Sequence, residues 1–292
     1  MRVALSITIV LLTVFLGDRA LSLSARTIVR HSQNQFVRMY EGKQRADILF
    51  LGDSRVDRNI SYPKVRDLTG KFCLNLGLGG NSVLVSEALL KDYVERYENP
   101  ALVVVELSHA TVDPATMGEM RIFSYCSTNI QALARTTDPT YSAFETVFTS
   151  LRFNDPAFWR LAVETVRPPS TRLLHNKIPE VLVRKWKGKS ASAGNRIIYR
   201  ENLEALQRIC SFADARGFQL RLLISPSWHD FKRAIVNFDV WKTALQEAAG
   251  KHPVHDYSDV FVANPDYFND EMHLNAAGAD RFVEKLHADG VL

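Results

Sequence analysis

The sequence predicts an α/β fold in which a parallel sheet carries helices on both faces. From Ala46 onward, short apolar runs alternate with longer amphipathic stretches, and this alternation is typical of strands joined by crossover helices. The chain has 292 residues, of which 46% are hydrophobic, so it is long enough to bury a full core. We therefore expect one such domain with an inserted region.

The individual elements follow from local signals along the chain. Pro100 ends a helix, Gly70 precedes a strand, and Gly217 stands where a helix needs its carboxyl cap. The predicted strands are 46–51, 72–76, 101–107, 218–224 and a short one at 254–255. The predicted helices are 82–97, 201–216, 238–249 and 276–288. Elements in this order predict a doubly wound parallel sheet.

Residues 1–24 have the character of a signal peptide or a signal anchor. Val3 to Gly17 contains no charge and is rich in Leu, Val and Ile. This run is shorter than the roughly 20 residues that span a bilayer comfortably. We expect residues 25–45 to form a polar stalk and residues 46–292 to lie outside the cytoplasmic membrane, either anchored to its outer face or secreted. The alternative is a buried amino-terminal helix of the soluble domain.

Between about residues 112 and 200 the alternation weakens, which predicts the insertion. We expect it to form a cap beside the carboxyl ends of the strands. It contains the basic run Arg184-Lys185-Trp186-Lys187-Gly188-Lys189, which small residues follow. Two interpretations of this run stay open: a solvated surface loop, or a contact with an anionic partner such as a polymer or lipid headgroups.

The composition argues against two classes of function. The formal net charge is +4, from 36 basic and 32 acidic residues, and so small an excess does not indicate binding to nucleic acid. No cluster of His and Cys has the spacing of metal ligands. We therefore expect no metal and no cofactor.

Two short segments near opposite ends of the chain predict a serine nucleophile and its base. Gly52-Asp53-Ser54 closes the apolar run Ile48 to Leu51, and Asp270-Glu271-Met272-His273 opens the last helix. A serine hydroxyl is a poor nucleophile until a base takes its proton, and a third group orients the base. We therefore expect Ser54, His273 and Asp270 to meet at the carboxyl edge of the sheet, where open α/β folds keep their sites.

Each of these residues also has a structural interpretation. Ser54 could cap the helix after the strand, and His273 could be a hydrogen-bonded core histidine. Asp53 is expected to stabilise the turn, and Asn275 to cap the last helix. The combination of Gly-Asp-Ser with the only Asp-x-x-His in the chain favours the catalytic interpretation.

These segments resemble the sequence blocks of the SGNH/GDSL hydrolase family, from Ala46 to Leu286 except for the insertion. Gly52-Asp53-Ser54 resembles the first block, and Asp270 to Gly278 resembles the last, in which Asp and His complete the triad. Asn75-Leu76-Gly77-Leu78-Gly79-Gly80-Asn81 resembles the second block, whose final glycine donates its N–H to the oxyanion. The resemblance implies that the amides of Ser54 and Gly80 form the oxyanion site. It also implies a flavodoxin-like, three-layer catalytic domain with strand order 2-1-3-4-5.

One block departs from this pattern. After the third strand the family usually has Gly-x-Asn-Asp, whose asparagine is a third oxyanion donor, but here the segment is Ser108-His109-Ala110-Thr111. Such a donor is worth on the order of 3 to 4 kcal/mol of transition-state stabilisation. Either Ser108, His109 or Asn81 replaces it, or the two amides act alone. Trp228 and His229, after the fourth strand, are further candidates for the pocket, with ordinary loop packing as the alternative.

The altered block, the Gly-Asp-Ser-Arg start and the membrane-anchored layout resemble, more loosely, one branch of proteins. This branch serves alginate and exopolysaccharide O-acetylation and teichoic-acid D-alanylation. The resemblance implies an acyl ester or acylated polysaccharide as substrate, and a partner acyltransferase in the membrane.

Two hypotheses of different classes follow. The first is a serine acyl-transfer enzyme, either an esterase or an O-acyltransferase acting on a cell-surface carbohydrate. The second is a non-catalytic component that binds polymer within a membrane polysaccharide-modification assembly. A third interpretation, phosphate or nucleotide binding at the turn from Gly77 to Gly80, is weak because that turn lacks a P-loop lysine and the Rossmann glycine spacing.

Overall fold

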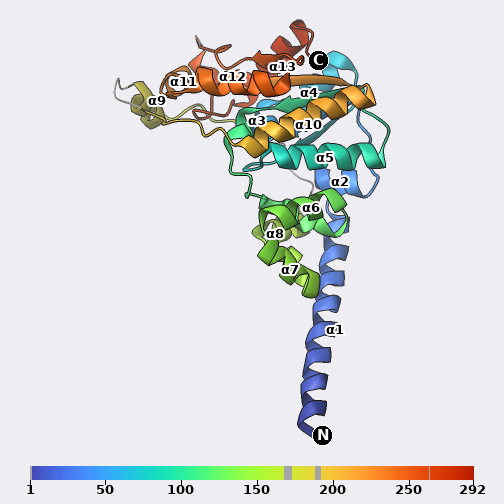
Figure 1. The fold of residues 1–292 in the computed structure, drawn as a ribbon. Helices are drawn as coiled ribbons and strands as arrows, with labels where there is room; N and C mark the ends of the chain where they lie inside the picture. The colour runs from blue at the N-terminus through green and yellow to red at the C-terminus, as the bar shows by residue number, and fades with distance from the viewer. Residues whose placement is uncertain (1, 168–172, 188–191, 263) are drawn as a thin grey trace. The chain divides into compact units, whose positions relative to one another are not determined.

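A parallel sheet of five strands forms the framework of the computed structural model, which describes residues 2–167, 173–187, 192–262 and 264–292 (Figure 1). The strands are β1 (Ile48–Gly52), β2 (Cys73–Gly77), β3 (Leu102–Glu106), β4 (Gln219–Ile224) and β5 (Val254–Asp256). Their order is β2-β1-β3-β4-β5, and all neighbouring strands are parallel. The predicted fold class and strand order are confirmed.

The strands form where the sequence is apolar on both faces. Every residue of β1 and of β3 is buried, as expected for central strands that are covered on both sides. In the register, Leu49 lies between Leu74 of β2 and Val103 of β3. Both strands end at the same edge, so the chain segments that follow them are brought together there.

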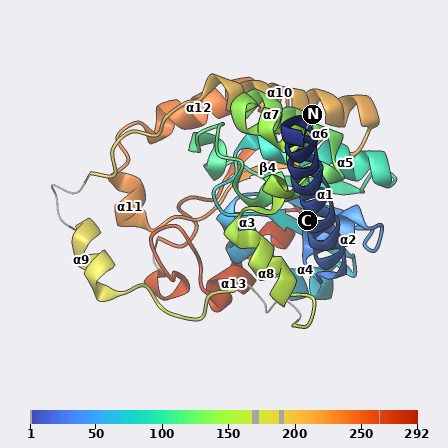
Figure 2. The ribbon, with the colours of Figure 1, turned by 90° about the horizontal axis from the view of Figure 1, so that it is seen from below.

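Helices cover both faces of the sheet (Figures 1 and 2). One layer consists of α5 (Val83–Arg96), α10 (Arg200–Arg216) and α12 (Phe238–Ala249). The other consists of α3 (Ser54–Asn59), α4 (Tyr62–Thr69) and α13 (Ala276–Ala288). Shorter elements complete this part of the chain: η1 (Ser108–Thr111), α9 (Glu180–Lys187), α11 (His229–Arg233) and η4 (Pro265–Tyr267). The architecture therefore has three layers.

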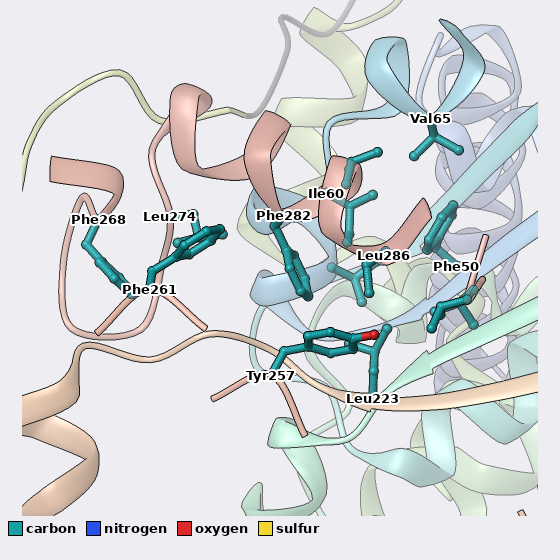
Figure 3. Packing of buried hydrophobic residues seen from close by; sticks show 14 of the residues in the cluster. Phe50, Ile60, Val65, Leu223, Tyr257, Phe261, Phe268, Leu274, Phe282 and Leu286 are labelled. Atoms are coloured by element: carbon teal, nitrogen blue, oxygen red, sulfur yellow. The ribbon is translucent and has the colours of Figure 1, made fainter. Parts of the chain in front are cut away.

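The core between β1, β4 and the layer of α13 consists of large apolar side chains (Figure 3). Phe50 and Leu223 come from the strands, while Phe282 and Leu286 come from α13, and all of them are buried. Burying one such side chain contributes roughly 1.5 to 3 kcal/mol. This packing fixes α13, and with it the loop that precedes α13.

Two predicted helix ends have the expected caps. Gly217 adopts a left-handed φ of 76° after α10, and its N–H donates to Ala213 O. Asn275 precedes α13, and its side chain accepts a hydrogen bond from Gly278 N at 3.1 Å. Asn275 therefore fixes where the last helix begins, directly after His273 and Leu274.

The chain forms two compact units. The helical unit comprises Met1–Lys43 with Met117–Ser170, and the sheet unit comprises Gln44–Thr116 with Thr171–Leu292. The elements of the helical unit are α1 (Arg2–His31), α2 (Gln35–Tyr40), η2 (Gly118–Tyr125), α6 (Thr128–Thr137), α7 (Pro139–Val147), η3 (Thr149–Phe153) and α8 (Pro156–Val163). These units reflect contacts within the chain. The expected boundaries of leader, stalk, catalytic domain and insertion stay a prediction.

Among the described residues, α1 is the one helix that is long and apolar enough to cross a membrane, by length and composition. It continues without a break from Arg2 to His31, past the point where the sequence suggests that a leader ends. The packing within the helical unit explains this, because Ser22, Ala25 and Val29 on the second half of α1 are buried.

The basic run in the expected insertion is helical where the structure describes it. Arg184 to Lys187 belong to α9, whereas Gly188 and Lys189 lie outside the described residues. Trp186 is buried and packs edge-on against Phe231, with ring centroids 4.9 Å apart. Arg184 to Lys187 therefore form a helix instead of the expected loop, with Trp186 in the core, while the basic side chains of Arg184, Lys185 and Lys187 are exposed to solvent.

Candidate active site

Ser54, His273 and Asp270 lie within hydrogen-bonding distance of one another, although more than 200 residues separate the serine from the other two. Ser54 Oγ is 2.8 Å from His273 Nε2. On the other side of the ring, His273 Nδ1 is 2.9 Å from Asp270 Oδ2 and 3.0 Å from Oδ1. This is the arrangement in which a carboxylate orients an imidazole that can take a serine proton.

The end of β1 positions Ser54. The strand stops at Gly52, and Asp53 becomes the N-cap of α3 by accepting a hydrogen bond from Arg55 N at 2.8 Å. Asp53 stabilises the turn, as predicted. Ser54 is consequently the first residue of α3, half-buried at the carboxyl edge of the sheet.

The loop before α13 positions His273. Asp270 Oδ1 accepts the N–H groups of Met272 and His273, each at 2.8 Å. Asn59, at the end of α3, holds the same loop from the other side, because its Oδ1 accepts from Leu274 N at 2.9 Å and its Nδ2 donates to Met272 O at 3.4 Å. The base is thus fixed by backbone hydrogen bonds on both sides of its own position. Sequence reasoning missed Asn59, which no local pattern distinguishes.

Asp270 remains ionised over a wide pH range. Burial by itself would raise its pKa, but the hydrogen bonds and the charge of His273, together with the two loop N–H groups, outweigh burial and lower the pKa to about 2. A carboxylate that keeps its charge can orient the imidazole and stabilise the imidazolium.

The turn after β2 lies against Ser54. A Cβ added at Gly79 would be 3.6 Å from Ser54 Cβ, and one at Gly77 would be 2.8 Å from both Asp57 N and Val56 Cβ. Gly77 therefore permits the close approach of the turn to α3, while Gly80 has a left-handed φ of 78°. In the part of the chain that the structure describes, neither the Ser54 N–H nor the Gly80 N–H donates a hydrogen bond. Both amides are available to a ligand.

A buried polar network occupies the place of the expected third block. Glu106, the last residue of β3, accepts hydrogen bonds from Ser108 Oγ, Ser108 N and Ser225 N. Arg55 donates through Nη1 to Ser108 Oγ at 2.7 Å and to Ser227 Oγ at 3.3 Å. Arg55 and Glu106 are both almost fully buried. Ser108 is therefore bound within this network.

Sequence reasoning did not identify Arg55 and Glu106 as part of the site. A signal for Glu106 existed, because it is the charged residue that closes the otherwise apolar strand Leu102–Glu106, and carboxylates are seldom buried without partners.

Burial and the charge of Asp53 raise the pKa of Glu106, whereas Arg55 and the hydrogen bonds act against this rise. Burial and the charge of Arg55 lower the pKa of Arg196 to about 10, and Arg196 Nη1 donates to Ser108 O at 3.3 Å.

The other two candidates for the third donor are also buried. His109 is inaccessible to solvent, and its Nε2 is 3.3 Å from Ser86 Oγ of α5. Burial lowers the pKa of His109, which favours the neutral ring. Both polar atoms of the Asn81 side chain are buried and have no hydrogen-bond partner among the described residues.

Trp228 and His229 line a cavity of about 510 Å³, together with Ile178, Val183, Phe261 and Pro265 among others. Trp228 is connected to the histidine loop, because its N–H donates to Glu271 O at 3.0 Å. His229 Nδ1 lies 3.8 Å from Asp259 Oδ1. The roles of these residues in a substrate pocket stay a prediction.

Among the described residues, no group of three or more His, Cys, Asp or Glu side chains could hold a metal ion. The carboxylates and the imidazole at the site are engaged with one another and with backbone groups, as described above.

No protein-family model matches the sequence, and no curated protein is significantly similar to it. Solved structures that resemble the chain include an acetyl xylan esterase, with a TM-score of 0.44 and 13% identity, covering 83% of this chain and 98% of that one. A GDSL-like lipase from Bacteroides thetaiotaomicron has a TM-score of 0.41 and 12% identity, covering 84% of this chain and 88% of that one. Likeness at this level assigns no activity, so the fold assignment rests on the sheet itself. Its order β2-β1-β3-β4-β5 between two helical layers is the fold that the resemblance to SGNH/GDSL hydrolases implies.

Proposed function

We propose that this protein catalyses serine-dependent acyl transfer from an ester. The observation that carries this proposal is the 2.8 Å contact between Ser54 Oγ and His273 Nε2, with Asp270 bound to the opposite ring nitrogen. A nucleophile that contacts a base, which in turn contacts an orienting carboxylate, is the arrangement that activates a serine for covalent catalysis.

The reaction has two halves. Ser54 Oγ attacks the ester carbonyl carbon while its proton passes to His273 Nε2, and the resulting oxyanion is bound by the N–H groups of Ser54 and Gly80. The carbon–oxygen bond to the leaving alcohol then breaks, and His273 returns the proton to that alcohol. An acyl-Ser54 intermediate remains. In the second half His273 deprotonates an acceptor hydroxyl, whose oxygen attacks the acyl carbon. The bond from that carbon to Ser54 Oγ then breaks, and His273 returns the proton to Ser54 Oγ.

The acceptor is either water, which makes the protein an esterase, or a sugar hydroxyl, which makes it an O-acyltransferase. The apolar helix α1 supports an exported location at the outer face of the cytoplasmic membrane. A cell-surface carbohydrate is the acyl substrate or acceptor available there, and a membrane acyltransferase is the partner we expect. Trp228 and His229, which line a cavity, are the proposed neighbours of the substrate, whereas the other pocket candidates, Asn81, Ser108 and His109, are buried.

A second candidate function is the binding of polymer without catalysis. It is favoured by the third block, where Ser108 is bound to Arg55 and Glu106 rather than presenting a free donor. In that case Ser54 and His273 would contact a ligand without forming a covalent bond.

Labelling with a fluorophosphonate distinguishes the two functions. We expect one probe per chain in the native protein and none in Ser54→Ala. The matched control is Ser211→Ala, because Ser211 is an exposed serine on α10 whose hydroxyl binds only its own helix, and this variant should label fully. Absence of labelling in folded native protein would contradict the enzymatic proposal.

The acceptor is tested with p-nitrophenyl acetate. An esterase releases acetate at the same rate as p-nitrophenol. A transferase releases at most one p-nitrophenol per chain without an acceptor, because the acyl-enzyme then persists, and it turns over only when an oligosaccharide is present, with the acetyl group appearing on the sugar. Both activities should disappear together in Ser54→Ala.

A further inference from the structure

The uncharged part of α1 is too short for a bilayer. Val3 to Gly17 is 15 residues, or about 22 Å of helix at 1.5 Å per residue, whereas the hydrocarbon core is about 30 Å thick. The charged pair Asp18 and Arg19 follows directly. If the side chains of Asp18 and Arg19 were free, the cost of burying their charges would stop the insertion of α1 into the hydrocarbon core at this point.

Asp18 and Arg19 are bound to the protein instead. Asp18 is buried, and its carboxylate accepts four hydrogen bonds from η3: from the N–H and the hydroxyl of Thr149, at 2.9 and 3.1 Å, and of Ser150, at 3.0 and 2.6 Å. Arg19 donates to Thr149 Oγ1 at 2.7 Å and to Val147 O at 3.1 Å. A charge that is fully hydrogen-bonded can enter an apolar region at far lower cost than a free one.

With Asp18 covered and Arg19 hydrogen-bonded to the neighbouring segment, the apolar face of α1 extends further. Leu16, Leu21 and Leu23 are all exposed, and Val3 to Leu23 is about 31 Å long, which matches the hydrocarbon core. Asp18 lies five residues before Leu23, about 7 Å deeper. Thr149 and Ser150 share that depth because they bind Asp18, and the neighbouring end of α7 does because Val147 O binds Arg19.

The elements beside Asp18 expose apolar side chains. Figure 1 shows α7 and α8 beside α1 within the helical unit. We define the lipid-facing surface as the exposed apolar residues of α7, α8 and their ends: Phe144, Val147, Phe148, Trp159, Val163 and Val166. Trp159 is 71% exposed, and an exposed tryptophan is typical of a membrane interface.

A cavity of about 570 Å³ adjoins this surface. Leu21 and Ala25 of α1 line one part of it, and Phe153, Phe158 and Trp159 line another. Its volume lies within the range of small-molecule sites, and its apolar lining suits a hydrocarbon chain.

The net charge of the chain resides in the same unit. The helical unit contains 11 Lys or Arg and 7 Asp or Glu, a difference of +4, whereas the sheet unit contains 25 of each. A basic, partly apolar surface is complementary to anionic phospholipids.

We propose that the lipid-facing surface is embedded in the interface of an anionic phospholipid bilayer, with an acyl chain in the cavity beside Trp159. This inference rests on the proposed anchoring by α1 and is independent of catalysis. The helical unit is then a membrane-binding module, and not only a stalk.

The test uses the full chain in nanodiscs that contain phosphatidylcholine and phosphatidylglycerol with brominated acyl chains, which quench nearby tryptophan. We expect Trp159→Phe to lose the quenched part of the fluorescence. Trp186→Phe, which alters a buried tryptophan of the sheet unit, should retain it. When Phe144→Trp is added to Trp159→Phe, the new tryptophan should be quenched by the brominated chains. Because Phe144 does not line the cavity, this variant tests the embedded surface separately from the cavity.

The outcomes separate the proposals. Equal quenching in Trp159→Phe and native protein, with no quenched component from Phe144→Trp, would overturn the embedded surface. Failure of the native chain to enter nanodiscs would overturn the anchoring by α1 and this inference with it. Labelling of Ser54 by fluorophosphonate is unaffected in either case, so the result does not depend on the proposed reaction.

Discussion

The two units differ in net charge, although each of them buries charged side chains and exposes some apolar ones. The sheet unit is balanced in charge and buries several of its charged side chains, including Arg55 and Glu106, beside the candidate site. The helical unit carries the whole net charge of +4 and exposes apolar residues such as Phe144 and Trp159. An excess of +4 spread over the entire chain indicates little, whereas its confinement to the helical unit supports the anionic bilayer that we propose for that unit.

In each unit a buried carboxylate joins separate segments by accepting several hydrogen bonds. Glu106 binds the segments after β3 and β4, and Asp18 binds η3. The carboxylate of the sheet unit organises the surroundings of the candidate site, while that of the helical unit is a charge on α1 that η3 covers. Variants of each should affect one unit and leave the other intact.

The largest effect is expected from Asp270→Asn. An amide in place of the carboxylate favours the wrong tautomer of His273 and does not stabilise its charged form, so kcat for ester cleavage should fall by about 10³ to 10⁴. Glu271→Gln, in the same loop, is the control and should change kcat by less than about twofold. A loss in Asp270→Asn below tenfold would show that the triad does not carry the reaction.

A large loss of stability is expected from Glu106→Ala. Removing the carboxylate leaves Ser108 N and Ser225 N without their acceptor in the core, and we expect about 3 kcal/mol less free energy of unfolding. The measurement is urea unfolding in detergent micelles. Glu98→Ala, whose carboxylate pairs with Arg45 at the surface, should change stability by less than about 0.5 kcal/mol. Equal effects of the two substitutions would refute the structural importance of the network.

The stability that Asp270 contributes should depend on pH. Its pKa is lowered from 3.8 to about 2, so the contribution is present above about pH 4 and is lost as the pH falls toward 2. The full contribution is on the order of 2 kcal/mol. We expect native protein to exceed Asp270→Asn by this amount at pH 7 and by progressively less below pH 4. A difference that is constant from pH 7 to pH 3 would contradict the lowered pKa.

The smallest effect is expected from Asp18→Ala, because it is confined to the helical unit. Loss of the hydrogen bonds from Thr149 and Ser150 should cost about 1 to 2 kcal/mol locally. Hydrogen exchange at the amides of residues 149 and 150 should accelerate about tenfold, while exchange in β1 and β3 stays unchanged. Accelerated exchange in both units would show that they do not respond independently.

The sequence predicted what local patterns encode. The apolar runs of β1 and β3, the cap residue Asn275 and the pair of Gly-Asp-Ser and Asp-x-x-His are all visible in windows of a few residues. The contacts of Asn59 with Leu274, of Arg55 with Ser108 and Ser227, and of Glu106 with Ser225 join segments that are 53 to 215 residues apart, and no local signal reports such a pairing. The burial of Trp186 is not visible in the sequence for a related reason. Its basic neighbours indicate solvent, whereas its packing partner Phe231 comes from another segment.

Asn59 has a mechanical consequence. Ser54 begins α3 and Asn59 ends it, so one short helix carries the nucleophile at its start and binds the loop of the base at its end. Because both partners are tied to the same helix, a displacement of α3 against the sheet is expected to carry the nucleophile and the loop of the base together. We therefore expect the distance between Ser54 Oγ and His273 Nε2 to vary less than the position of either residue.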